Sequence, residues 1–232
     1  MTRRILSLFA VAAVFILVAP MAHGQAPAPA GEHAASPVTP KEALERLKAG
    51  NARFVDGKRM PRDFRAQVAA TAAGQHPFAA VVSCMDSRAS AELVLDEGIG
   101  DVFSLRVAGN VIDPNFLGSL EYAAKVVGVR LILVMGHTEC GAIKGAIDDV
   151  KLGNLTSLLA KIRPAVEATR YQGDRSAKNY GFVDAVARKN VELAMADIRR
   201  RSTVLAEVER AGTIKIAGAM YDLETAMLDV FQ

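Results

Sequence analysis

Residues 130–140 read RLILVMGHTEC, an apolar run that leads directly into a histidine and a cysteine. The run is short, rich in Leu, Ile and Val, and has little polar alternation, which is typical of a strand covered on both faces in a parallel sheet. Similar runs occupy residues 78–83, 102–107 and 213–218, with helical patterns between them. This alternation predicts an α/β domain whose mainly parallel β-sheet is flanked by helices.

Local signals place the expected helices and one further strand. Residues 39–42, Thr-Pro-Lys-Glu, have the form of a capping box and predict a helix that begins near residue 40 and ends between residues 50 and 57. Helical spacing of apolar residues predicts further helices over residues 116–127, 142–150, 155–169 and 183–200. Residues 220–231 are expected to form an edge strand or hairpin, which would place an antiparallel strand at the edge of the sheet.

The N-terminal segment has the features of an export signal. Arg3 and Arg4 precede an apolar run over residues 5–22, which ends at small residues. We therefore predict a signal peptide over residues 1–24 and a periplasmic or secreted protein. Residues 25–38 form an Ala/Pro-rich spacer, and residues 39–232 suffice for one domain with a proper core. The alternative is an uncleaved anchor, but the run is near the lower length limit for crossing a bilayer, so no stable membrane insertion is expected after cleavage.

Charge gives no sign of a polyanionic partner. The formal net charge is +3, and loss of Arg3 and Arg4 with the signal peptide would leave about +1. The basic triplet at residues 199–201 falls at the end of a predicted helix, where cations interact favourably with the helix dipole. No nucleic-acid partner is therefore predicted.

The chain has only two cysteines, Cys84 and Cys140, and each is placed for metal binding. Cys84 follows the predicted strand over residues 78–83, and His137 follows the one over residues 130–136, so both should lie where open α/β sheets bind ligands. Cys140 lies about one turn beyond His137 at a predicted helix start, which favours a thiolate. Two thiolates and one imidazole suit zinc, and three protein ligands leave the open position of a catalytic site.

A disulfide between Cys84 and Cys140 is the alternative in an oxidising compartment. The polar neighbours of both cysteines and the size of the domain favour zinc instead. Asp86 is close enough to Cys84 to accept a hydrogen bond from a water molecule at the open position, and Arg88 can hold that carboxylate ionised with its fork of donors. An ordinary salt bridge in a turn is the alternative for this pair.

These residues carry a resemblance to a known family. Residues 84–88, Cys-Met-Asp-Ser-Arg, and residues 136–141, Gly-His-Thr-Glu-Cys-Gly, resemble the C-x-D-x-R and H-x-x-C-G signature of β-class carbonic anhydrases. Residues 50–54, 106–110 and 221–225 resemble three further motifs in the family's order. The resemblance covers about residues 40–232, and with the export signal it indicates an exported bacterial member with its catalytic domain over residues 39–232.

The resemblance implies a set of site residues. Cys84, His137 and Cys140 would bind one Zn²⁺ per chain, and Asp86 and Arg88 would form the family's catalytic dyad. The substrate pocket would use the residues that match the family's positions, which are Gln75, Phe103, Tyr122 and the backbone amide of Gly141. In some members the aspartate occupies the fourth metal position, so the resting state of Asp86 stays open.

The implied activity is that of a carbonate dehydratase, the reversible hydration of carbon dioxide to bicarbonate and a proton. Two alternatives stay open, a carbon disulfide or carbonyl sulfide hydrolase on the same fold and a non-catalytic zinc or thiol protein. The resemblance also implies a homodimer or a higher even-numbered oligomer. Val81 stands where one bacterial subgroup has a tryptophan of an inhibitory bicarbonate site, so that form of control is not expected.

Overall fold

The structure is a computed structural model, and it describes residues 38–231. The predicted signal peptide, residues 1–24, and nearly all of the predicted spacer, residues 25–38, lie outside the described residues. Within the described part, no helix has the length and apolar character needed to cross a membrane.

The described residues contain one five-stranded sheet, with the strand order β2-β1-β3-β4-β5. Strands β1 to β4 run parallel to one another, and β5 is antiparallel to β4. The strands are β1 (Ala79–Ser83), β2 (Val102–Arg106), β3 (Leu131–His137), β4 (Lys215–Tyr221) and β5 (Leu228–Phe231). The predicted α/β class, the mainly parallel sheet and the antiparallel edge strand are confirmed.

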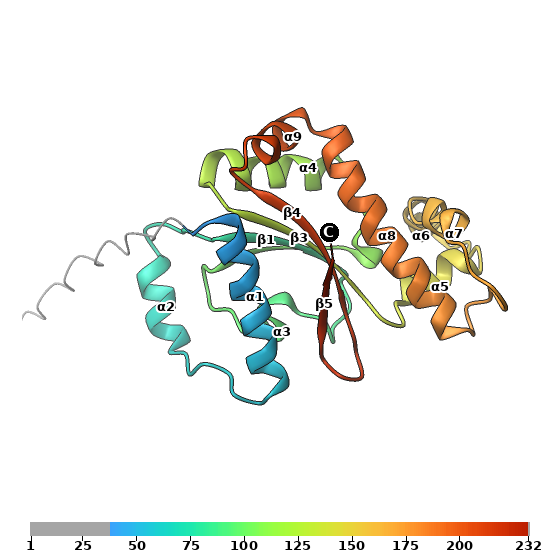
Figure 1. The fold of residues 1–232 in the computed structure, drawn as a ribbon, viewed down its shortest axis with the longest axis horizontal. Coiled ribbons are helices and arrows are strands. Elements are labelled where there is room, and N and C mark those ends of the chain that lie inside the picture. Colours follow the sequence, from blue (N-terminus) through green and yellow to red (C-terminus); the bar gives the residue numbers. More distant parts are fainter. Residues whose placement is uncertain (1–37, 232) are drawn as a thin grey trace, which may run out of the picture. The chain divides into compact units, whose positions relative to one another are not determined.

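Helices flank the sheet on both faces (Figure 1). The α-helices are α1 (Pro40–Val55), α2 (Phe64–Thr71), α3 (Ala91–Val94), α4 (Pro114–Glu121), α5 (Gly141–Ile147), α6 (Gly153–Ala160), α7 (Arg163–Ala168), α8 (Tyr180–Arg201) and α9 (Thr203–Arg210). A 3₁₀ turn, η1 (Ala108–Asn110), follows β2, and a π-helical segment, η2 (Tyr122–Val127), continues α4.

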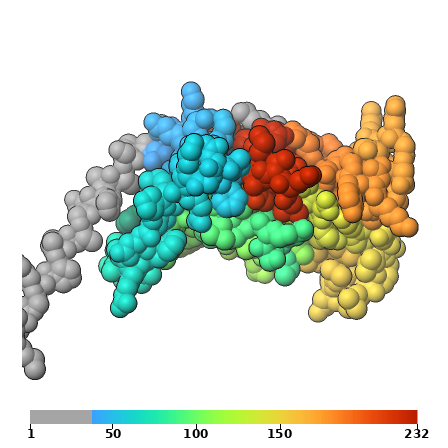
Figure 2. All heavy atoms as spheres, turned by 90° about the horizontal axis from the view of Figure 1, so that it is seen from below, coloured from blue at the N-terminus to red at the C-terminus, as the bar shows by residue number. Residues whose placement is uncertain are grey.

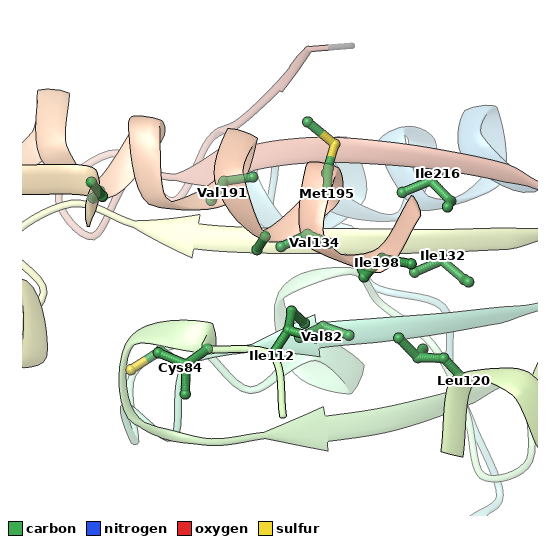
Figure 3. Close-up of a cluster of buried hydrophobic side chains, with 14 of the residues drawn as sticks. Val82, Cys84, Ile112, Leu120, Ile132, Val134, Val191, Met195, Ile198 and Ile216 are labelled. Atoms are coloured by element: carbon green, nitrogen blue, oxygen red, sulfur yellow. The ribbon is translucent and has the colours of Figure 1, made fainter. Parts of the chain in front are cut away.

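Alternate residues of each central strand face two separate hydrophobic cores. In β3, Ile132 and Val134 join the core under α4, α5, α8 and α9, whereas Leu131 and Leu133 join the core under α1 and α3. All seven residues of β3 are buried, as expected for a central parallel strand. Figure 3 shows part of the first core, in which Val191 and other side chains of α8 lie against β3.

The first helix begins where the sequence predicts. Thr39 Oγ1 accepts a hydrogen bond from the Glu42 amide at 3.2 Å, and Glu42 Oε2 accepts one from the Thr39 amide at 2.7 Å. This reciprocal capping box satisfies amides that a helix N-terminus otherwise leaves without partners. Gly50 packs so closely on the next layer that a Cβ there would lie 1.8 Å from the carbonyl oxygen of Leu95 in the loop after α3.

The C-terminal hairpin is tied to α1 by a single side chain. Asn51 Nδ2 donates to the Ala226 carbonyl in the β4–β5 turn, and Asn51 Oδ1 accepts from the Leu228 amide, both at 2.9 Å. Figure 2 shows the hairpin, in red, beside the blue α1 on the surface of the molecule. The Asn51 amide therefore fixes the edge strand against the first helix.

Three features of the helices differ from the sequence-based prediction. The helix expected over residues 155–169 is two helices, because Pro164 at the start of α7 has no N–H to continue the hydrogen bonds of α6. The helix expected over residues 183–200 begins earlier, at Tyr180. Short helices α2, α3 and α9 are not predicted, and α2 has no buried residue that would give it a clear pattern.

Candidate metal centre

The three predicted metal ligands converge at the carboxyl ends of two adjacent strands. Strands β1 and β3 are parallel neighbours, with Ser83 opposite Met135, so Cys84 just after β1 and His137 at the end of β3 reach the same edge. Cys140 is the N-cap residue of α5. One ligand atom from each of the three residues lies within 4.8 Å of the others, and all three residues are buried.

The sulfur atoms are spaced for a shared metal ion and not for a bond to each other. Cys84 Sγ and Cys140 Sγ are 3.9 Å apart, and both thiols are free. A disulfide would need about 2.05 Å. Two sulfurs that each lie about 2.3 Å from a tetrahedral zinc ion are about 3.8 Å apart. The observed spacing therefore fits zinc.

His137 presents an unpaired nitrogen toward the same space. Its Nδ1 lies 2.8 Å from the Thr138 carbonyl oxygen, which can only accept, so Nδ1 carries the proton. Its Nε2 is buried and has no hydrogen-bond partner among the described residues. A buried imidazole whose other nitrogen donates to a carbonyl is the usual arrangement of a zinc-binding histidine. Together with the two sulfurs, this orphaned atom shows that the residues present fit a zinc ion.

The environment of Cys84 favours its thiolate. Hydrogen bonding from the Cys140 thiol lowers the pKa of Cys84, and the Gly109 amide donates to the same sulfur at 3.4 Å. The same bond raises the pKa of Cys140, because a second negative charge beside the first is unfavourable in a buried site. One thiolate is therefore available in the metal-free protein, and the second proton would leave when a cation binds.

Asp86 and Arg88 form a bidentate pair beside the ligands. Arg88 Nε donates to Asp86 Oδ1 at 2.9 Å, and Arg88 Nη2 donates to Oδ2 at 2.8 Å. These bonds hold the pKa of Asp86 well below its usual range. Asp86 Oδ2 also lies 3.8 Å from His137 Nε2, so the carboxylate faces the space between the ligands. The structure thus brings the predicted dyad to the predicted metal site.

Arg106 supports this loop, a role that the sequence alone does not predict. Its guanidinium donates to the Cys84 carbonyl at 3.1 Å and to the Asp86 carbonyl at 2.5 Å. Both Arg106 and Gly109 fall in residues 106–110, one of the family-like motifs, and that motif was the available signal. Asp184 and Asn190 of α8, which bond to the Glu139 amide and the Gly109 carbonyl, belong to no motif and were not predicted.

The predicted substrate residues fall into separate groups within one chain. Gly141 is the first residue of α5, next to Cys140. The rings of Phe103 and Tyr122 have centroids 6.4 Å apart and line a cavity of about 610 Å³ between β2 and α4, to which no metal ligand contributes. Gln75 lines a different hollow with residues 71–74 and 99–100. Neither the cavity of Phe103 and Tyr122 nor the hollow of Gln75 is lined by Cys84, His137 or Cys140.

Comparisons with known proteins agree with the site. Residues 79–228 match the family described as carbonic anhydrase. The chain is 37% identical to carbonic anhydrase 2 of Mycobacterium tuberculosis over 191 residues, which cover 80% of this chain and 89% of that protein.

Among solved structures, the β-carbonic anhydrase CafA of Aspergillus fumigatus is 26% identical and has a TM-score of 0.65, with 83% of this chain and 90% of that one covered. Two tetrameric β-carbonic anhydrases from Sordaria macrospora share the fold, with a TM-score of 0.62, 22% identity and coverage of 82% and 93%. The fold, the cysteine–histidine–cysteine group and the extent of these matches all lead to one assignment: the chain belongs to the β-class carbonic anhydrase family.

Proposed function

We propose that this protein catalyses the reversible hydration of carbon dioxide to bicarbonate and a proton, with one zinc ion per chain. The observation that carries the proposal is the convergence of Cys84, His137 and Cys140, whose ligand atoms lie within 4.8 Å of one another, beside the Asp86–Arg88 pair. Family membership supports the same activity. The adjacent charged pair has no evident use in a purely structural zinc site.

The three ligand residues would hold the metal, and a bound zinc ion would supply acidity by bringing the pKa of a water molecule down to about 7. The chain's own contribution is to place acceptors and donors around that water. Three ligands leave one position for it. Because both sulfurs are buried, the site also limits access of bulk solvent to the ligands.

Asp86 is the acceptor that would orient the water. Arg88 donates to both carboxylate oxygens from the solvent side and keeps Asp86 ionised. The carboxylate can therefore accept a hydrogen bond from the water molecule throughout the pH range of the reaction. Arg106 holds the carbonyl groups of Cys84 and Asp86 and so keeps the acceptor at a fixed distance from the ligands. In this arrangement the carboxylate is bound to Arg88 and is free of the metal position.

We propose further that the substrate pocket is completed in a homodimer or a higher even-numbered oligomer. Within the described sheet, β2 pairs only with β1, so its outer edge has unpaired backbone groups. Beside that edge, Tyr122 is 50% exposed and Val126 is 70% exposed, and the cavity that contains Phe103 lies open. A second copy covering this surface would bury these rings and could bring them to a metal centre. The Sordaria macrospora proteins of the same fold are tetrameric.

The predicted signal peptide over residues 1–24 supports a second proposal, that the protein is an exported bacterial enzyme which acts in the periplasm or outside the cell. Cell fractionation and N-terminal sequencing of the purified protein test it. Export predicts a mature chain that begins near residue 25 and is found outside the cytoplasm. A full-length chain in the cytoplasmic fraction would contradict this location.

The activity itself is tested with one preparation of purified protein. Zinc is quantified per chain, and carbon dioxide hydration is followed by stopped flow across pH, with carbonyl sulfide hydrolysis assayed in parallel. The proposal predicts about one zinc per chain and hydration as the main activity. Folded protein that is free of metal, a Cys84–Cys140 disulfide in native material, or hydrolysis of carbonyl sulfide without hydration would each reject it.

A further inference from the structure

We infer that α8 carries two positioning residues: Asp184 holds the loop that bears His137 and Cys140, and Asn190 holds the loop whose Gly109 contacts Cys84. The inference rests on the proposed zinc site and adds to it the part of the fold that sets the spacing of the ligands. Among the described residues, neither side chain forms a hydrogen bond to the side chain of a ligand. Asp184 forms a hydrogen bond to the backbone of a loop that carries two ligands. Asn190 forms one to the backbone of a loop that contacts the third ligand.

Asn190 holds the loop that contacts Cys84. Its side chain is buried, and Nδ2 donates to the Gly109 carbonyl at 2.8 Å. The amide of the same glycine donates to Cys84 Sγ at 3.4 Å. Gly109 has φ +68°, and a Cβ there would lie 2.5 Å from Ile162, so the position is closely packed. Asn190 therefore fixes the residue that supplies a hydrogen bond to the first sulfur.

Asp184 holds the loop that bears His137 and Cys140. Its Oδ1 accepts a hydrogen bond at 2.8 Å from the backbone amide of Glu139, which lies between the two ligands. Glu139 adopts φ +54°, a left-handed conformation that residues with a side chain rarely take. A hydrogen bond to this amide stabilises the turn that directs Cys140 back toward His137.

Both bonds come from one rigid element that is packed on the sheet. Helix α8 is 22 residues long, and a Cβ on Gly136 would lie 2.7 Å from Val191, so the helix lies directly over the end of β3. Figure 3 shows Val191 beside Val134, in the same core to which Cys84 belongs. The loops after β2 and β3 are distant in sequence, and α8 hydrogen-bonds to both of them, on either side of the metal site. The 3.9 Å separation of the sulfurs therefore depends on this helix.

The test compares metal binding in variants of the two residues. Asp184→Ala removes the acceptor, whereas Asp184→Asn keeps an oxygen that can accept from the Glu139 amide. Asn190→Leu removes the donor with little change of size. Zinc affinity is measured by competition with a chromophoric chelator, and the thiolate–cobalt absorption bands of the Co²⁺-substituted protein report the geometry of the ligands. Arg188→Ala is the matched control, because Arg188 lies on the same helix and its guanidinium pairs with exposed Asp229.

We expect zinc binding about 10-fold weaker or more in Asp184→Ala and Asn190→Leu, with shifted cobalt bands, and near wild-type values in Asp184→Asn and Arg188→Ala. A purely structural role would lower the melting temperature of metal-free and zinc-loaded protein alike and leave the chelator competition unchanged, and that result would overturn the inference. If Asn190→Leu does not fold, the comparison of Asp184→Ala with Asp184→Asn tests the inference by itself. If the wild-type protein binds no zinc, the proposed function fails as well, which is a separate and recognisable outcome.

Discussion

Asp86 lies between two partners, Arg88 on one side and the imidazole of His137 on the other. The bidentate bonds from Arg88 keep it ionised, and its Oδ2 lies 3.8 Å from His137 Nε2. A small rotation would decide whether this oxygen orients a water molecule or takes a metal position. In the proposed function, the bonds from Arg88 would therefore set which of these two roles Asp86 takes.

Replacing this carboxylate should separate metal binding from turnover. We expect Asp86→Ala to retain about one zinc per chain and to lose about 100-fold or more in kcat, because the ligands stay but the acceptor is gone. Cys84→Ser is the contrasting variant and should lose zinc and activity together. Stopped-flow hydration with zinc analysis measures both, and unchanged turnover in Asp86→Ala would remove this residue from the mechanism.

A second buried carboxylate, Asp96, makes stability depend on pH. Burial alone would raise its pKa, but hydrogen bonds from Arg53 and Arg62 outweigh that effect and lower the pKa of Asp96 to about 2. Because the folded-state pKa lies below the unfolded value, the stabilisation is fully present above about pH 4 and is lost as the pH falls toward 2.

Asp96→Asn tests this dependence with little change of shape. The variant should be less stable than wild type by on the order of 1 to 2 kcal/mol at neutral pH, and the difference should shrink as the pH falls from about 4 to about 2. Asparagine tolerates the left-handed backbone at this position, where φ is +48°, so the backbone adds little to the effect. Urea unfolding of metal-free protein at several pH values measures it, and a constant difference across this range would contradict the assignment.

At the level of elements, the strands were predictable and the short helices were not. A central parallel strand such as β3 is buried along its whole length, and its continuous apolar run is visible in the sequence. Helix α2 buries no residue, so no periodic pattern marks it. The break between α6 and α7 depends on the hydrogen bond that Pro164 cannot donate, which the apolar spacing of the sequence does not reveal.

Some residues of the site were also predictable from the sequence, and others were not. Cys84, His137 and Cys140 were predictable because each follows a recognisable strand within a short motif. Asp184 and Asn190 were not, because their function depends on which loops α8 crosses after folding. A sequence records the identity of such residues, but their hydrogen-bond partners are set by packing between elements that are distant along the chain.

The contact between α1 and the loop after α3 gives an element-level prediction. Gly50→Ala should destabilise the protein by about 1–3 kcal/mol or more, because the added Cβ would lie 1.8 Å from the backbone oxygen of Leu95 and would push the two elements apart. Chemical denaturation measures the change. Lys48→Ala, at an exposed position of the same helix, is the control and should leave stability nearly unchanged; equal stability of both variants would argue against the close packing.

At the scale of the whole molecule, one chain leaves both a strand edge and an aromatic cavity uncovered on the same side. Ser104 is the exposed residue in the middle of β2 and also lines the cavity with Phe103 and Tyr122. Hydrogen bonds available along this edge and burial of the rings would both favour association with a second copy. The proposed second copy would also explain why the predicted substrate residues lie apart within one chain.

Ser104→Arg should therefore disrupt the assembly without affecting the fold. Analytical ultracentrifugation is expected to give a dimer or larger even-numbered oligomer for wild type and mainly monomer for the variant, with zinc retained and hydration reduced. Lys178→Ala, an exposed substitution away from β2, should change neither mass nor activity. A wild-type monomer with full activity, or a Ser104→Arg oligomer as active as wild type, would refute this interface.

The dual role of α8 has a consequence for how the protein would release its metal. Val191, Met195 and Ile198 on this helix are part of the main core, so the helix cannot move away from the ligand loops unless that core opens. Backbone amides near His137 should then exchange with deuterium as slowly as those of the central strands. Zinc would dissociate at the rate of cooperative opening of the domain and not at the faster rate typical of surface loops.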